Sequence, residues 1–319
     1  MDFLNLGRKF FLLAPMAGYS NSPCRKIFRQ YGADGSVSEF VHCRAVLNGS
    51  RAVLERMAFD DGERPIGIQI FGADPSEMAE AAAKIEELLK PDFIDVNFGC
   101  PAPNAVDAGA GAALLKKPDK MAEIISRICG AIKTPVTAKM RIGWDSSSII
   151  VPEAAVSLAS AGAKMITLHG RTKTNGYRGE SNWALIEETA QKLQVPLVGN
   201  GSVEKLSAGE LVRSACAGFM VGRAALGNPW IFGLLKRRLQ TGGDCDIEVP
   251  ARERVQLAVR YAKLVCDGSR FGVSKENLTH AKGQIMRFIK GCPGFKKIRS
   301  QMHEVKSLEE LEEILCAYL

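Results

Sequence analysis

Short apolar runs alternate with amphipathic stretches through the first 240 residues, and this alternation restricts the chain to few folds. Each run is rich in Val, Ile, Leu or Phe and ends near Gly, Pro, Asn or a charged residue, as buried strands do. Eight such runs lie at about 11–14, 35–41, 65–71, 93–98, 135–140, 165–169, 196–200 and 218–222. Apolar residues at helical spacing separate them, for example at 76–89, 119–132, 152–161, 183–193 and 203–214.

Eight strand-then-helix units predict an α/β fold, a (β/α)8 TIM barrel. A doubly wound open sheet is the structural alternative, but no Gly-x-Gly-x-x-Gly follows the first strand. Residues from about 241 differ: Thr-Gly-Gly-Asp-Cys-Asp resembles a linker, and only helical periodicity follows it. We therefore expect a catalytic barrel domain at 1–240 and an all-α helical domain at 241–319.

Composition excludes several classes of protein. With 46% hydrophobic and 24% charged residues the chain resembles an ordinary globular protein, and no apolar run approaches the ~18 residues of a membrane span. The short apolar stretch after Arg8 and Lys9 ends in Pro15, which does not fit a signal peptide, so we expect a cytoplasmic protein. Nine scattered cysteines without a Cys-x-x-Cys pair indicate neither disulfides nor a metal site. The net charge of +7 is compatible with a polyanionic partner but too modest to establish one.

Polar and reactive side chains fall at the predicted strand ends, where barrel active sites assemble. They are Gln69, Asn97, Cys100, Lys139, Arg141, His169, Arg171 and Asn200. Cys100 is the leading catalytic candidate, because it follows a buried strand and precedes a stretch with almost no large side chain. The alternatives are that Cys100 is a small buried hydrophobe, Lys139 a surface lysine and His169 a hydrogen-bonded core histidine.

Two glycine-containing segments predict a phosphate site. Gly199-Asn200-Gly201-Ser202 follows the seventh strand, and Gly222-Arg223-Ala224-Ala225 follows the eighth. Barrels commonly hold a phosphate there, with backbone N–H groups and a helix start. The alternative is that these glycines only form tight turns.

Seven blocks resemble the flavin-dependent tRNA-dihydrouridine synthases. They occur in the family's order between residues 13 and 230. The blocks are Leu13-Ala14-Pro15-Met16-Ala17-Gly18, Ser38-Glu39-Phe40-Val41, Gln69-Ile70-Phe71-Gly72, Asp95-Val96-Asn97-Phe98-Gly99-Cys100-Pro101, Lys139-Met140-Arg141-Ile142-Gly143-Trp144, His169-Gly170-Arg171-Thr172 and Val221-Gly222-Arg223-Ala224-Ala225-Leu226-Gly227-Asn228-Pro229-Trp230. Met286 to Gly294 resembles the family's helical domain more loosely.

The resemblance implies an FMN-bound barrel followed by a helical tRNA-binding domain. The residues that would contact the flavin or its phosphate are Pro15, Met16, Ala17, Gln69, Lys139, His169, Asn200, Gly201, Gly222 and Arg223. Cys100 matches the family's proton donor, and Asn97 its neighbour on the substrate side. The reaction implied is reduction of the C5=C6 bond of tRNA uridines to dihydrouridine, with hydride to C6 and a proton to C5. NADPH or NADH would re-reduce the flavin, and family likeness favours NADPH and a monomer.

The substrate would be bound by basic and aromatic residues. Residues 281–300 carry six Lys or Arg and no acid, including Lys282 and Arg287, although a solvated helix face would look the same. Arg141, Arg171 and Tyr177 are further substrate-side candidates, and Lys173 and Arg178 lie in the same loop as Tyr177.

The sequence departs from the family pattern at three positions. Asn104 stands where lysine is common, Ser202 where aspartate is common and Phe40 where methionine is usual. Two alternatives remain. One is a flavin oxidoreductase of a free pyrimidine or other small unsaturated ring, similar to the dihydroorotate dehydrogenases. The other is a non-redox protein, either a phosphate-binding barrel that isomerises or condenses small metabolites or a pseudoenzyme that only binds RNA. Which uridines are reduced does not follow from one sequence.

Overall fold

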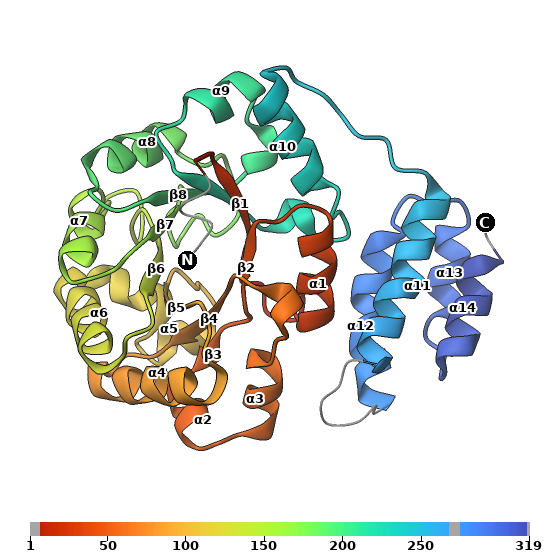
Figure 1. The fold of residues 1–319 in the computed structure, drawn as a ribbon, viewed down its shortest axis with the longest axis horizontal. Coiled ribbons are helices and arrows are strands. Elements are labelled where there is room, and N and C mark those ends of the chain that lie inside the picture. The colour runs from red at the N-terminus through yellow and green to blue at the C-terminus, as the bar shows by residue number, and fades with distance from the viewer. Residues whose placement is uncertain (1–6, 268–274, 318–319) are drawn as a thin grey trace.

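The computed structural model describes residues 7–267 and 275–317 and places a closed barrel beside a group of helices (Figure 1). Within these residues all sheet pairings between named strands are parallel, and eight strands close the ring because β2 pairs with both β1 and β4. The ring consists of β1 (Phe10–Leu13), β2 (Gly35–Val37), β4 (Ile66–Phe71), β5 (Phe93–Phe98), β6 (Val136–Arg141), β7 (Ile166–His169), β8 (Leu197–Asn200) and β9 (Gly218–Val221). The TIM-barrel prediction is confirmed.

The second expected strand, 35–41, is interrupted. Ser38 lies between β2 and the two-residue β3 (Val41–His42), which pairs with β4 outside the ring. Ser38 Oγ accepts a hydrogen bond from Gln69 N at 3.1 Å and donates to Glu39 O at 3.0 Å. The Ser38 hydroxyl thus replaces a backbone carbonyl as the acceptor for Gln69 N, and the chain after Ser38 leaves the ring of strands.

Helices surround the barrel between its strands (Figure 1). They are α1 (Ser22–Gln30), α2 (Cys43–Leu47), α3 (Arg51–Met57), α4 (Pro75–Leu89), α5 (Pro103–Asp107), α6 (Pro118–Ala131), α7 (Glu153–Ser160), α8 (Trp183–Lys192), α9 (Ala208–Arg213) and α10 (Ile231–Thr241). The expected helix at 203–214 is divided into the 3-10 turn η4 (Val203–Lys205) and α9. Ser207 starts a new helix because its hydroxyl accepts from Glu210 N while the Glu210 carboxylate accepts from Ser207 N.

Two phenylalanines fill the barrel near the beginning of its strands. A Cβ at Gly67 would lie 2.1 Å from the Phe93 ring, and one at Gly218 would lie 2.6 Å from the Phe10 ring. Only glycine leaves room for these rings. The barrel is therefore packed at that end, and a ligand enters from the carboxyl ends of the strands.

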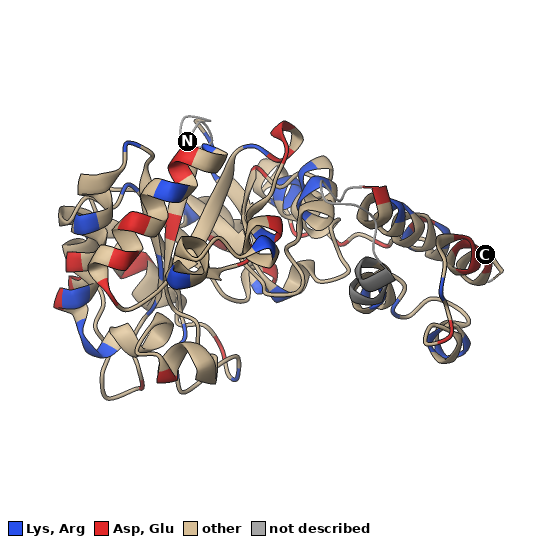
Figure 2. Cartoon of the chain, turned by 90° about the horizontal axis from the view of Figure 1, so that it is seen from below, with Lys and Arg blue, Asp and Glu red and all other residues tan. Residues whose placement is uncertain are grey.

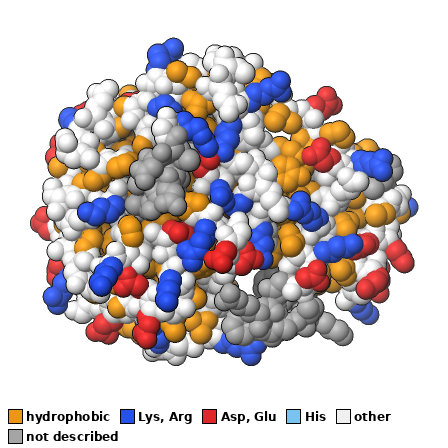
Figure 3. All heavy atoms as spheres, in the orientation of Figure 1, with side chains coloured by type: hydrophobic (Ala, Val, Ile, Leu, Met, Phe, Trp, Pro, Cys, Tyr) orange, Lys and Arg blue, Asp and Glu red, His pale blue; other side chains and the backbone are white. Residues whose placement is uncertain are grey.

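Residues 242–250 form no helix or strand and lead to α11 (Ala251–Asp267), α12 (Lys275–Phe288), α13 (Phe295–Gln301) and α14 (Leu308–Cys316). The C-terminal part is thus helical, as expected. It contacts the barrel beside α1, where Asn21 Nδ2 donates to the Tyr261 hydroxyl at 3.0 Å. Acidic residues gather on α14 (Figure 2), whereas basic and acidic side chains are interspersed over the barrel face seen in Figure 3.

Candidate active site

A cavity opens at the carboxyl ends of the strands, with an open volume of about 830 Å³ that includes solvent at its mouth. The expected residues that line it are Pro15, Met16, Asn97, Cys100, Lys139, Arg141, His169, Arg171, Tyr177, Asn200, Gly201, Gly222 and Arg223. The barrel topology thus brings together side chains that are up to about two hundred residues apart in the sequence.

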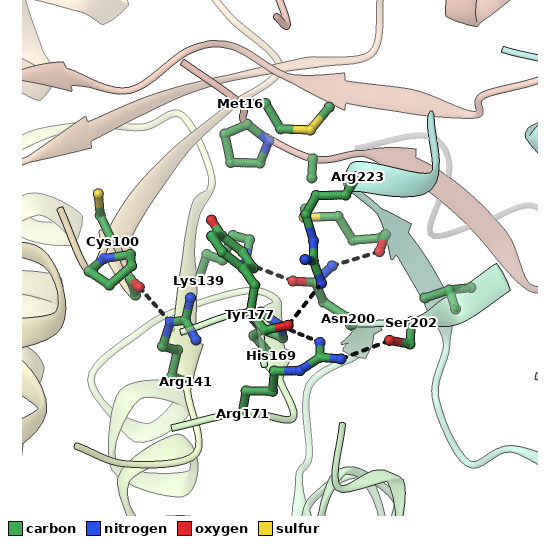
Figure 4. A pocket seen from close by; sticks show the side chains of 18 of the residues that line it. Met16, Cys100, Lys139, Arg141, His169, Arg171, Tyr177, Asn200, Ser202 and Arg223 are labelled. Atoms are coloured by element: carbon green, nitrogen blue, oxygen red, sulfur yellow. Dashed lines mark hydrogen bonds between the residues drawn. The ribbon is translucent and has the colours of Figure 1, made fainter. Parts of the chain in front are cut away.

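Cys100 and the glycine-containing loops lie at opposite sides of this cavity (Figure 4). Lys139, His169 and Tyr177 lie between them in the same view. A flat ligand whose phosphate occupies the Gly201 and Gly222 side can therefore extend its ring system toward the thiol.

Burial raises the pKa of the Cys100 thiol, and the nearby cations Arg141 and Lys139 only partly oppose this. The thiol is therefore protonated near neutral pH and able to donate a proton. Its backbone N–H donates to Asn97 Oδ1 at 2.8 Å, and Gly111, in the left-handed region with φ of 57°, passes close behind it. A Cβ at Gly111 would lie 3.0 Å from the Cys100 carbonyl oxygen, so the glycine permits this approach.

Lys139 extends from β6 into the cavity, and its ammonium donates to Asn200 Oδ1 at 2.9 Å. Burial, followed by repulsion from Arg141, lowers its pKa to about 8, although Asp95 attracts it. None of the ion pairs among the described residues involves Lys139. An electron-rich or anionic group placed next to it would therefore be stabilised.

His169 is neutral. Arg171 Nη1 lies 3.2 Å from His169 Nε2, and a guanidinium can only donate, so Nε2 accepts and the ring proton resides on Nδ1. Burial, together with the positive charges of Lys139 and Arg141, lowers the pKa of His169 well below its usual value. The imidazole is therefore suited to hydrogen bonding rather than to ion pairing.

The two arginines at the strand ends hold a loop. Arg141 donates to the carbonyl oxygens of Gly99, Thr172 and Gly176 at 2.8, 3.0 and 2.8 Å. Arg171 Nη2 donates to Gly179 O and to Ser202 Oγ, both at 2.8 Å. Their guanidinium donors thus fix the backbone of residues 172–179, which carries Tyr177 over the cavity.

Tyr177 is 53% exposed, and two cations lie against its ring. The Arg223 and Arg141 guanidinium carbons are 4.4 and 5.5 Å from the ring centre. The His169 ring lies further below, with 6.3 Å between ring centres. An exposed aromatic ring at a cationic mouth can stack on a nucleobase.

Four expected residues do not line the cavity. Ala17 is exposed on the loop after β1, and Gln69 is buried beneath the floor, where it hydrogen-bonds Asp95 and Asn97. Lys282 in α12 donates to Val305 O at 2.8 Å. Arg287 is exposed at the boundary between α12 and the barrel, where it donates to the Tyr19 hydroxyl at 2.9 Å.

Asp95 was not selected from the sequence. Its buried carboxyl accepts from Gln69 Nε2 and Thr137 Oγ1, both at 2.6 Å, and burial raises its pKa. A carboxylate inside the apolar run of β5, two residues before Asn97 and on the same face, is the signal that could have identified it.

The described residues contain no cluster of His, Cys, Asp and Glu that could hold a metal ion. None of the helices found in the described ranges has the length and apolar character needed to cross a membrane.

A sequence model described as dihydrouridine synthase matches residues 12–318, which include the cavity and most of the helical part. The chain belongs to the dihydrouridine synthase family. An Aquifex aeolicus protein named "Probable tRNA-dihydrouridine synthase" is 33% identical over 315 residues, covering 97% of this chain and 95% of that protein. A Rickettsia conorii protein of the same name is 37% identical over 267 residues, covering 82% and 80%.

One solved structure, of a candidate lyase/mutase from Burkholderia cenocepacia, matches with a TM-score of 0.50 and 15% identity. The match covers 75% of this chain and 87% of that chain, and it shows the barrel fold alone.

Proposed function

We propose that this protein reduces the C5=C6 bond of specific tRNA uridines, with FMN as its cofactor and Cys100 as its proton donor. The observation that carries the proposal is the placement of a protonated thiol and a partly buried ammonium, Lys139, in one cavity. The names of the relatives support tRNA as the substrate.

The residues present fit a flavin mononucleotide. Gly201, with φ of 108°, and Gly222 bring backbone close to the cavity, and Arg223 supplies a cation for the phosphate. A Cβ at Gly201 would lie 2.2 Å from Ser181 Oγ, so this approach requires glycine. Lys139 would face the ring system, and Pro15 and Met16 would cover one side of it.

When bound and reduced, the flavin supplies a hydride to C6 of uracil. Cys100 would supply the proton that C5 requires, so the base gains two hydrogens and the thiol becomes a thiolate. Arg141 and Lys139 lower the energy of this thiolate, because both oppose the rise in the Cys100 pKa. Solvent then returns the proton to sulfur.

A uridine stacked inside tRNA must be extruded to reach this cavity, at a cost of a few kcal/mol. The Tyr177 ring, exposed at the mouth, could stack on a base, and the basic residues of α12 and α13 would attract the phosphate backbone. Lys282 and Arg287 have protein partners, so they would act together with other exposed cations such as Lys290 and Lys296.

We also propose that NADPH is the reductant, that the active form is a monomer and that the protein acts in the cytoplasm. The barrel at 1–240 would carry the chemistry, and the helices within 241–319 would bind tRNA.

Two measurements test the proposal. Purified protein should show the visible absorption of oxidised flavin, and tRNA from a strain that lacks the gene should lose dihydrouridine at particular positions. A colourless protein would contradict flavin use. Unchanged dihydrouridine in the deletion strain would contradict tRNA as the substrate.

A further inference from the structure

A second group of cations lies at the rim of the barrel, outside the lining of the cavity. The ammonium groups of Lys116 and Lys173 lie 3.7 and 4.3 Å from the centre of the Trp144 ring. We refer to these three residues as the Trp144 cluster. They come from the loops after β5, β6 and β7, so neighbouring strands bring them together at the carboxyl end of the barrel.

The two loops that carry Trp144 and Lys173 are held together by backbone hydrogen bonds. Lys173 N donates to Gly143 O at 3.0 Å, and Thr174 N donates to Trp144 O at 2.9 Å. Gly143 also bridges to Ile149, and a Cβ at Gly143 would lie 2.2 Å from the Ser148 carbonyl oxygen. The Trp144 ring is therefore presented by a closed loop.

Within residues 7–267 and 275–317, the two ammonium groups have no carboxylate partner. Neither lysine forms an ion pair among the described residues. The neighbouring Asp145 carboxylate instead accepts from the hydroxyls of Ser147 and Ser148, at 2.7 and 2.8 Å. Lys116 is exposed, and Lys173 is partly exposed. Two converging cations without an acid form a site for phosphate.

The Trp144 cluster lies across the barrel from the helical part. In the ring of strands β6 is the fourth from β1 in either direction, and α1, which follows β1, contacts α11. Figure 1 shows β6 and β7 on the side away from α11–α14. A substrate that reaches from the helices to the Trp144 cluster must span the whole mouth, as a folded RNA does.

We propose that the Trp144 cluster binds phosphate groups of the tRNA backbone and fixes the substrate on the side of the mouth opposite the helical domain. The inference rests on the proposed function and adds a second anchoring point to it. With contacts on two sides, the tRNA cannot pivot about the helices, so the extruded uridine enters in one orientation.

The test compares the double variant Lys116→Gln/Lys173→Gln with Lys133→Gln/Lys164→Gln. The control removes the same charge before β6 and β7, at the opposite end of the barrel, where both lysines are exposed. Binding of unmodified tRNA is measured against salt concentration. The cluster variant should lose roughly tenfold in affinity, and its salt slope should fall by about 2, one per phosphate contact. The control should match wild type.

Flavin content and the rate of flavin reduction by NADPH without tRNA should be equal in both variants. A salt slope that matches the control would overturn the inference and leave the Trp144 cluster with a structural role. A raised KM for NADPH with unchanged tRNA binding would also overturn it, because the phosphate bound would then be the reductant's. Failure of the wild type to form dihydrouridine would refute the proposed function instead.

Discussion

Asn97 Oδ1 accepts hydrogen bonds from the backbone N–H groups of Cys100 and Gly99, at 2.8 and 3.0 Å. Asn97 Nδ2 donates to Gln69 Oε1 at 2.8 Å, and Gln69 Nε2 donates to Asp95 at 2.6 Å. The direction of the Cys100 thiol thus depends on a chain of buried polar groups that runs across β4 and β5. Each group in this chain satisfies its neighbour, so the loss of one leaves another unpaired.

Replacing Asn97 by alanine should slow dihydrouridine formation by roughly 10- to 100-fold with little change in the KM for tRNA, since the thiol loses its alignment. The free energy of unfolding should fall by about 1–3 kcal/mol, because two N–H groups lose their acceptor. Steady-state kinetics and denaturant unfolding measure both effects. Asn48→Ala, at an exposed asparagine, is the control. Wild-type turnover in folded Asn97→Ala would refute the positioning role.

The affinity of the apoprotein for FMN should weaken as the pH rises through about 8. Lys139 carries its charge below its lowered pKa of about 8 and loses it above. The anionic cofactor favours the charged form, so it binds best on the acidic side of this value. Fluorescence titration of FMN between pH 7 and 9.5 measures this dependence. Lys139→Met should flatten the curve, and an equally steep curve in that variant would assign the titration to another group.

Gly201→Ala should weaken FMN binding and lower stability by about 1–3 kcal/mol, because the residue has φ of 108° and its Cβ would meet Ser181 Oγ. Gly130→Ala, in α6 where a Cβ would meet nothing within 4 Å, should be neutral or slightly stabilising. Flavin content after purification and thermal unfolding compare the two. Full flavin retention in Gly201→Ala would show that this loop is not the phosphate site.

Arg141→Lys should loosen residues 172–179 and raise the KM for tRNA several-fold. An ammonium cannot reproduce the three carbonyl contacts that the planar guanidinium makes. Hydrogen exchange of the loop should accelerate, whereas Arg213→Lys on the exposed side of α9 should change nothing. Unaltered exchange in Arg141→Lys would mean that the loop is held by other contacts.

The barrel could be predicted because each strand is a short apolar run that ends in a break, a purely local signal. Lys139 and His169 could be selected as candidates for the same reason: a polar group at the end of a buried strand needs a partner. The interruption at Ser38 could not be predicted, since its hydroxyl replaces a backbone partner only after β4 is in place.

Whether a polar residue lines the cavity depends on how its strand is paired with the neighbouring strand and on the loops around it. Gln69 lies opposite Asp95 in the β4–β5 pairing, which places its amide under the cavity floor instead of on its lining. Arg141 and Arg171 were expected on the substrate side, and they do line the cavity, but their donors are engaged with loop carbonyls. The positions of loop carbonyl oxygens leave no periodic signal in a sequence, so the contacts of these two arginines could not be predicted from it.

The most direct test of the central claim is a single-turnover reaction of the flavin-reduced protein with an unmodified tRNA transcript, followed by mass spectrometry of its nucleosides. Wild type should convert particular uridines to a product heavier by two hydrogens. Cys100→Ala should retain its flavin yet react about 10²- to 10⁴-fold more slowly, the usual loss when a general acid is removed. Cys245→Ala, a half-exposed cysteine outside the barrel, is the control. Product formation by Cys100→Ala at the wild-type rate would contradict the account.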